Sequence, residues 1–128
     1  MLHDFAIYAY IPARDMERAR QFYENKVGLK AKQESNGGVV YEFGRGTAAF
    51  LYRTPNAGTS QASQAFWSVP DVDGLIRKLK ARGVVFEDYP DIPGERSSEG
   101  AVTGGGAKAA WFKDSEGNIM ALIEEVPG

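Results

Sequence analysis

The sequence predicts an α+β fold in which two β-α-β-β-β modules form a curved mixed sheet around a central trough, with the helices outside. Two observations predict it. Segments with the two-residue alternation of strands flank a segment with helical spacing, and this order occurs twice along the chain. The helix-capping residues also repeat, because Asp15 and Asp71 lie 56 positions apart and Gly28 and Gly83 lie 55 apart. One module alone would leave a sheet face open, so the two are expected to enclose a trough.

Length and composition bound the possible functions. The 128 residues predict a single domain, 1–128, built from repeats 1–55 and 62–126 joined by a short linker. The composition, 43% hydrophobic and 25% charged, is typical of a soluble globular protein. There is no cysteine, His3 is the one histidine, and the net charge of −2 lacks the basic character of nucleic-acid binders. With no long apolar run and no signal-peptide pattern, we expect a cytoplasmic protein without membrane contact.

The first repeat is expected to contain four strands and one helix. Residues 4–11 alternate as a strand does, and Pro12 is expected to end that strand. A helix over 15–27 begins after Asp15, whose side chain can cap the first turn, and ends at Gly28. Three short strands then follow, with glycines at the turns, over residues 29–35, 38–43 and 47–53.

The second repeat follows a small, polar linker over 54–61 that contains Pro and Gly. A strand over 64–69 precedes a helix over 71–82, which Asp71 caps and Gly83 ends. The remaining elements are expected to be a strand over 84–87, a long glycine-rich loop over 90–107 and a hairpin over 110–124. The turn of that hairpin, 114–118, requires a positive φ at Gly117.

Two stretches carry a resemblance to a known family. They are Arg20-Gln-Phe-Tyr-Glu-Asn-Lys-Val-Gly-Leu29 and Trp111-Phe-Lys-Asp-Ser-Glu-Gly-Asn-Ile-Met-Ala-Leu-Ile-Glu124. Together with the internal repeat, they resemble the vicinal oxygen chelate superfamily. This superfamily includes glyoxalase I, extradiol dioxygenases, methylmalonyl-CoA epimerase and the fosfomycin and bleomycin resistance proteins. The resemblance covers nearly the whole chain, and it implies a fold rather than one reaction.

The resemblance also implies where a metal would bind. In metal-dependent members, four strand residues that face the trough, usually His and Glu, hold the ion. The internal repeat places these four positions at Tyr8, Phe50, Gln64 and Ala121. A divalent first-row metal needs several nitrogen, oxygen or sulfur donors, and none of the four residues is a histidine or a carboxylate. We therefore expect no metal and no cofactor.

The strand face that shares parity with these positions is rich in aromatic residues. An apolar, aromatic trough with a few polar groups suits a flat or ring-bearing small molecule. The alternative is that the side chains fill the trough themselves, or that the parity is shifted by one residue and the trough belongs to Ile7, Ala9 and Leu51. The long loop adds charges at Glu95, Glu99 and Lys108 that could clamp a ligand, as a lid or as a disordered segment. The candidate ligand-binding residues are Tyr8, Tyr10, Phe50, Tyr52, Gln64, Phe66, Arg96 and Ala121.

Two function classes follow. The first is metal-independent binding of a small, aromatic or antibiotic-like molecule, as the resemblance to bleomycin resistance proteins implies. The second is a glyoxalase-type lyase or isomerase, or a dioxygenase, that uses residues outside the usual ligand positions. His3 is the one candidate imidazole base, and the candidate carboxylates on or beside strands are Glu42, Glu87, Glu124 and Glu125. The missing metal ligands favour the binder, and the resemblance implies a homodimer.

Overall fold

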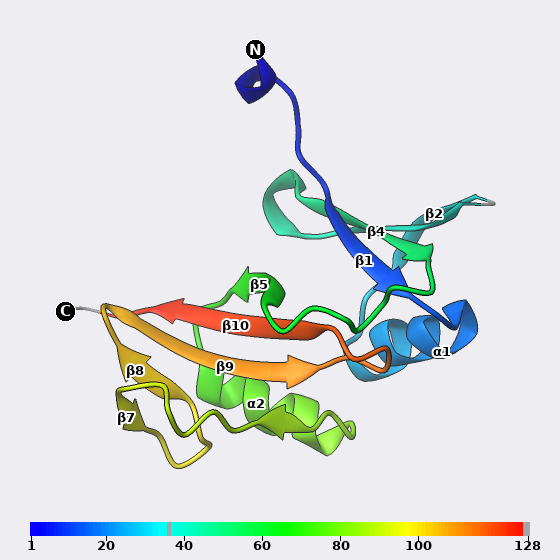
Figure 1. The fold of residues 1–128 in the computed structure, drawn as a ribbon. Coiled ribbons are helices and arrows are strands. Elements are labelled where there is room, and N and C mark those ends of the chain that lie inside the picture. Colours follow the sequence, from blue (N-terminus) through cyan, green and yellow to red (C-terminus); the bar gives the residue numbers. More distant parts are fainter. Residues whose placement is uncertain (36, 127–128) are drawn as a thin grey trace.

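The computed structural model describes residues 1–35 and 37–126 and contains two mixed β-sheets (Figure 1). The first sheet has four strands in the order β1-β4-β3-β2, and β1 runs parallel to β4 while the other neighbours are antiparallel. It comes entirely from the first half of the chain. Its strands are β1 (Ala9–Ala13), β2 (Ala31–Ser35), β3 (Gly38–Glu42) and β4 (Ala48–Arg53).

The second sheet comes from the second half of the chain. Its order is β5-β10-β9-β8-β7, with β6 paired to β9, and β5 runs parallel to β10. Both β1 and β5 therefore lie at a sheet edge. The strands are β5 (Ser63–Ser68), β6 (Phe86–Glu87), β7 (Glu95–Arg96), β8 (Val102–Gly104), β9 (Ala107–Lys113) and β10 (Ile119–Glu125).

Two helical segments begin where their caps predict. In α1 (Met16–Gln21) the Asp15 side chain accepts the Arg18 N–H, and in α2 (Val72–Ala81) the Asp71 side chain accepts the Gly74 N–H. A π-helical turn, Phe22–Lys26, continues α1. Short 3₁₀ turns lie at Leu2–Asp4 and Gly44–Gly46. In the described part of the chain, neither helix has the length and apolarity to cross a membrane.

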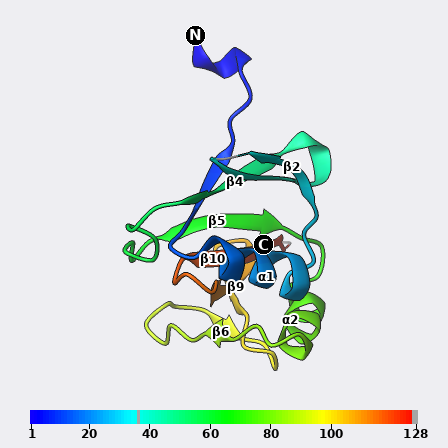
Figure 2. The ribbon, with the colours of Figure 1, turned by 90° about the vertical axis from the view of Figure 1, so that its right-hand side faces the viewer.

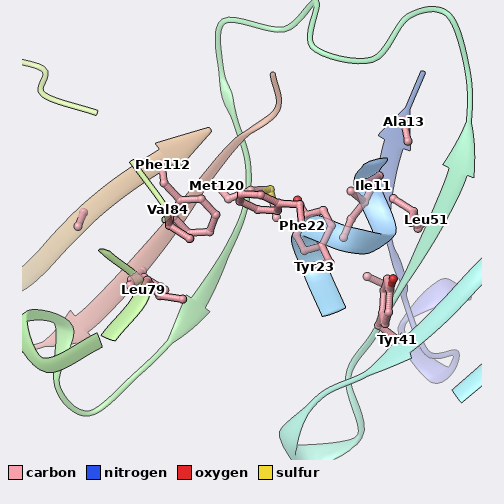
Figure 3. Packing of buried hydrophobic residues seen from close by; sticks show 14 of the residues in the cluster. Ile11, Ala13, Phe22, Tyr23, Tyr41, Leu51, Leu79, Val84, Phe112 and Met120 are labelled. Carbon is pink, nitrogen blue, oxygen red and sulfur yellow. The ribbon is translucent and has the colours of Figure 1, made fainter. Parts of the chain in front are cut away.

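The core joins the two sheets through the first helical segment. Figure 2 shows the four-stranded sheet lying over β5 and β10, with α2 beyond the second sheet. Phe22 and Tyr23 lie between the side chains of the two sheets, as Figure 3 shows. Phe22 contacts Phe112 with ring centroids 6.2 Å apart, and Tyr23 contacts Tyr41 at 6.3 Å. The two halves therefore share one hydrophobic core.

Several expected boundaries are wrong, and the first strand begins at Ala9 rather than at residue 4. Pro12 does not end β1, which runs on to Ala13. A proline can stay inside this strand because β1 is an edge strand and leaves one row of backbone groups unpaired. The segment 90–107, expected to be a long loop, also contains regular structure, because β7 and β8 pair within it and β8 extends the sheet beside β9. The two strands are too short, and the segment too rich in glycine, for an alternating pattern to be recognised in the sequence.

The hairpin turn between β9 and β10 binds the second half of the chain to the first through hydrogen bonds. The buried Glu116 carboxylate accepts the backbone N–H groups of Arg14 and Asp15, both at 2.9 Å, and the Arg18 guanidinium at 2.8 Å. Asp114 accepts the Tyr23 hydroxyl. Asn118 donates to the Pro12 carbonyl at 2.7 Å and accepts the Gly58 N–H at 3.2 Å. These contacts connect the hairpin turn to the start of α1, to β1 and to the linker.

Candidate functional site

Three of the predicted ligand-binding residues form an aromatic cluster on the four-stranded sheet. The Tyr10 ring lies 4.7 Å from the Tyr52 ring and 6.1 Å from the Phe50 ring, measured between centroids. Their strand neighbours Ile11 and Leu51 point the other way, into the core. Two-residue alternation therefore places the cluster on the face away from α1.

A second set lies on the six-stranded sheet. Gln64 and Phe66 are exposed, while the residues between and after them, Ala65 and Trp67, pack against the core. Ala121 pairs in register with Phe66 and is only 2% exposed, so its methyl group is covered. Phe66 and its neighbours thus form the outer face of β5 and β10.

Two further aromatic residues adjoin this second face. Trp111 pairs with Ala121 across the β9–β10 ladder, and the Tyr89 ring packs against it at 5.7 Å. The Tyr89 hydroxyl is buried and has no hydrogen-bond partner among the described residues. Neither residue is among those predicted from the sequence. Counting the hairpin register outward from the turn would have paired Trp111 with Ala121, whereas Tyr89 lies in an irregular segment with no such signal.

A single chain leaves one large aromatic side chain of each face exposed. Tyr10 is 61% exposed and Phe66 is 59% exposed, so neither sheet covers the other's aromatic residues. Large apolar side chains exposed together mark a binding or association surface. The structure therefore brings Tyr10, Phe50 and Tyr52 together on one sheet, and Gln64, Phe66 and Ala121 on the other, but does not oppose the two sets within one chain.

A cleft of ≈ 930 Å³ opens between the two sheets, beside the edges of β1 and β5. It is mainly apolar, with Trp67, Phe43 and several alanines in its wall. Its charged residues are Arg45 and Glu125, which form no ion pair within residues 1–35 and 37–126. Phe66 is the one residue of the predicted ligand-binding set in the described lining of this cleft, whereas β1 contributes Ala9 and Ile11, which belong to the alternative parity.

Charged residues in and next to the 90–107 segment hold the segment in place. The Arg96 guanidinium donates to the carbonyls of Tyr89, Ile92 and Gly94 at 2.9–3.0 Å. Lys108 pairs with Asp73 at the start of α2. Glu99 lies 3.4 Å from Arg77 of the same helix. These contacts fasten the segment to α2, so most of the predicted clamp charges already have partners.

Ionisable groups with shifted pKa values belong to such structural contacts. Burial alone would raise the pKa of Glu116, but hydrogen bonds from Arg18, the Asp15 and Arg14 N–H groups and Ser115 lower it to about 2. For Asp73, burial likewise opposes the hydrogen bonds from Lys108 and Ser97, and the net effect is a lowered pKa. Both carboxylates are therefore held as anions by contacts that stabilise the fold.

The side chains at the four family metal positions do not fit a metal ion. Tyr8 lies before β1 and is exposed, Phe50 belongs to the aromatic cluster, and Ala121 has no donor atom. Gln64 offers one neutral oxygen. Across residues 1–35 and 37–126, no three His, Asp or Glu side chains gather in an arrangement that could hold a metal. No catalytic step through a metal is derived for these positions.

The chain is similar to several solved structures of the same architecture. UcmS2 has a TM-score of 0.73 and 16% identity, over 93% of this chain and 96% of that one. TnmS3, an antibiotic binding protein from Streptomyces sp. CB03234, has a TM-score of 0.72 and 23% identity, over 98% of both chains. A glyoxalase/bleomycin resistance protein/dioxygenase from Alicyclobacillus acidocaldarius has a TM-score of 0.70 and 18% identity, over 97% and 93% of the two chains. At these identities the likeness shows a shared fold.

No curated protein matches the chain at a significant level. A family model does match, over residues 5–124, which is nearly the entire sequence. The resemblance drawn from the two motifs and the repeat is thereby confirmed, and so is the α+β fold. This chain belongs to the Glyoxalase/Bleomycin resistance protein/Dioxygenase superfamily.

Proposed function

We propose that this protein binds a small aromatic or antibiotic-like molecule without a metal, in an apolar trough that two copies of the chain complete. The observation that carries the proposal is the aromatic cluster in which Tyr10 is exposed and Phe50 and Tyr52 are partly buried. Stacked and tilted rings with phenol groups at their edges offer a flat ligand both apolar contact and hydrogen bonds. Among the described residues, no three His, Asp or Glu side chains gather to hold a metal, which favours a binding mode that does not use one.

The proposed trough has one wall from each copy. The aromatic cluster of one chain would face Phe66 and Gln64 of the other, which lie on a sheet face that is open in the same way. A twofold axis repeats this pairing, so a homodimer would have two identical troughs. The ligand class is supported by TnmS3, whose description as an antibiotic binding protein accompanies a fold that covers 98% of this chain.

A dye titration tests the proposal. The protein would be dialysed against EDTA and titrated with 8-anilinonaphthalene-1-sulfonate (ANS), an aromatic dye whose fluorescence rises in apolar sites. We expect saturable binding that EDTA leaves unchanged and that Tyr10→Ala weakens about tenfold or more, equivalent to ~1.4 kcal/mol. Val85→Ala is the matched control, because Val85 is an exposed apolar side chain outside both faces.

The opposite results are equally clear. If Tyr10→Ala binds ANS as tightly as Val85→Ala does, the aromatic cluster is not the site. If EDTA abolishes binding and one equivalent of nickel, zinc, manganese or iron(II) restores it, the metal-free proposal is wrong. A Tyr8→Phe, Gln64→Ala double variant would then show whether the family's metal positions hold that ion.

A further inference from the structure

The cleft between the two sheets lies on the opposite face of β1 from the aromatic cluster. Ile11 forms part of the cleft wall, whereas Tyr10, its neighbour in the same strand, points to the outer face. The floor of the cleft is buried, because Ile11, Ala49 and Met120 are each at most 3% exposed. Its volume of ≈ 930 Å³ is in the range of small-molecule sites. A ligand on the outer sheet faces would leave this cavity without a role.

Two aromatic rings meet at a steep angle in the wall of the cleft. The centroids of the Phe43 and Trp67 rings are 5.8 Å apart, and the ring planes are inclined by 80°. Trp67 also stacks on Phe112, with centroids 6.2 Å apart and planes inclined by 13°, so its position is fixed. Several alanines in the wall leave space beside these rings. A further ring in that space can make edge-to-face or offset-stacked contacts with both of them.

Two charged side chains lie at the open side of the cleft. Arg45 and Glu125 line it, and both residues are exposed. Neither forms an ion pair with the other, or with any other charged group in residues 1–35 and 37–126. A cation and an anion at one opening are complementary to a ligand that carries both charges close together. The headgroup of an α-amino acid has this property.

The backbone of Arg45 adopts a conformation that favours glycine. Arg45 lies in the turn Gly44–Gly46 between β3 and β4 with a φ of 62°, and it is the one non-glycine residue with a positive φ in the described chain. The turn is closed without its side chain, because the Phe43 N–H donates to the Thr47 carbonyl at 2.9 Å. Glycine would avoid the unfavourable left-handed region. A strained residue with a charge beside a cavity is typical of a ligand-binding position.

We propose that the cleft binds a zwitterionic aromatic α-amino acid, with its carboxylate on Arg45, its ammonium group on Glu125 and its ring against Phe43 and Trp67. The Arg45 guanidinium can donate two N–H groups to the ligand carboxylate. The Glu125 carboxylate can accept the ammonium protons. The described lining of this site comes from one chain, so the site is separate from the two-copy trough and does not require a second copy.

Three indole ligands test recognition of the headgroup. L-Tryptophan carries both charges, indole-3-propionate lacks the ammonium group and tryptamine lacks the carboxylate. Each would be titrated into the wild-type protein in an isothermal calorimeter. We expect saturable binding of one tryptophan per chain, and dissociation constants at least about tenfold higher for the other two ligands. Equal affinity for all three would overturn the proposal, and so would the absence of saturable tryptophan binding.

Two charge-removing variants assign each contact. Arg45→Gly should weaken the binding of tryptophan and indole-3-propionate about tenfold and leave tryptamine unchanged. Glu125→Gln should weaken the binding of tryptophan and tryptamine and leave indole-3-propionate unchanged. Lys30→Gln is the control, since Lys30 is an exposed cation outside the described lining of the cleft. Losses in Arg45→Gly that are the same for all three ligands would contradict a contact between Arg45 and the carboxylate.

The strained turn provides a check against simple unfolding. Because glycine tolerates a φ of 62°, Arg45→Gly should melt at a temperature no lower than the wild type while it loses ligand affinity. Arg45→Lys keeps the charge and should bind tryptophan within about threefold of the wild type. A lowered melting temperature of Arg45→Gly, together with weak binding by Arg45→Lys, would show that Arg45 supports the fold and would overturn its role as a ligand contact.

Tyr10→Ala distinguishes this site from the proposed trough. Tyr10 points away from the cleft, so this variant should lose ANS affinity and bind tryptophan as the wild type does. Loss of both ligands in Tyr10→Ala would show one shared site and would overturn a separate cleft site. If Tyr10→Ala keeps its affinity for both ligands, the proposed trough is wrong and the cleft site stands.

Discussion

At the scale of single residues, Glu116 joins the two halves of the chain. Its carboxylate accepts two backbone N–H groups that precede α1 and a charged guanidinium from the same helix. The sequence gives no direct sign of this role, since an acidic residue in a polar turn is normally a solvated one. Its contacts are more than 95 positions away in the chain, at Arg14, Asp15 and Arg18. Local patterns cannot reveal partners at that separation.

Replacing Glu116 with glutamine tests its contribution to stability. The amide keeps the shape but presents only one oxygen to donors that now meet two, and it lacks the charge that strengthens them. We expect the free energy of unfolding to fall by about 2 kcal/mol or more in urea titrations at neutral pH. Glu17→Gln, an exposed change in the first turn of α1, should stay within about 0.5 kcal/mol of the wild type. Equal losses in both variants would contradict the role of Glu116.

The same carboxylate predicts how stability depends on pH. The folded pKa of Glu116 is about 2, below its ordinary value of 4.5. A lowered pKa means that this stabilisation is fully present above the unfolded value and is lost as the pH falls through the folded one. The stability difference between wild type and Glu116→Gln should therefore be constant near neutral pH and shrink between pH 4.5 and about 2. A difference that grows on acidification would show that the pKa is shifted the other way.

At the scale of elements, the strand–helix–strand order was predictable because each element has its own local signal. Asp15 and Asp71 cap helices as expected, and Gly117 adopts a φ of 89° in the hairpin turn. The errors lie where local rules compete with tertiary structure. Edge position lets β1 run through Pro12, and the short β7–β8 hairpin is too brief to show alternation. The division into repeats 1–55 and 62–126 stays a prediction, although each sheet draws its strands from one of these ranges.

The linker between the repeats also packs more closely than its composition predicts. Ala57 is fully buried, and Gly58 follows it with a φ of 73°. A Cβ on Gly58 would lie 2.3 Å from the Glu116 carbonyl oxygen, so the linker passes directly over the hairpin turn. Linker and turn therefore form one packed unit between the sheets.

Two matched glycine substitutions test this packing. Gly58 and Gly105 both have positive φ values, 73° and 61°, but a Cβ on Gly105 would meet no atom within 4 Å. Gly105→Ala should cost about 1–2 kcal/mol from backbone strain alone. Gly58→Ala should cost at least about 2 kcal/mol more, because the backbone must also move away from the turn. Thermal and urea unfolding measure the stability of both variants. Similar losses of stability at the two positions would contradict close packing of the linker against the turn.

At the scale of the whole molecule, the sequence predicted which aromatic side chains share a strand face better than how the two sheets are arranged. Tyr10, Phe50 and Tyr52 meet on one face because two-residue alternation and strand pairing bring them together. Arg96 was predicted to bind the ligand, but its guanidinium instead donates to three backbone carbonyls near its own segment. The sequence pattern could not distinguish these two roles. The arrangement of the two sheets involves long-range contacts of Glu116 and Asn118, which the two-residue alternation of the sequence cannot predict. In this arrangement Tyr10 and Phe66 are both exposed in one chain.

The central claim is that each binding trough combines the aromatic cluster of one chain with the second face of another. Complementation between two inactive variants tests it most directly. Tyr10→Ala and Phe66→Ala homodimers would each be titrated with ANS, and then a 1:1 mixture would be titrated after subunit exchange. In a mixed dimer, one trough carries both substitutions and the other carries none. About half of the dimers should be mixed, so the account predicts recovery of about a quarter of the wild-type sites, at wild-type affinity. A mixture that binds no better than the average of the two variants would show that the site does not combine two chains.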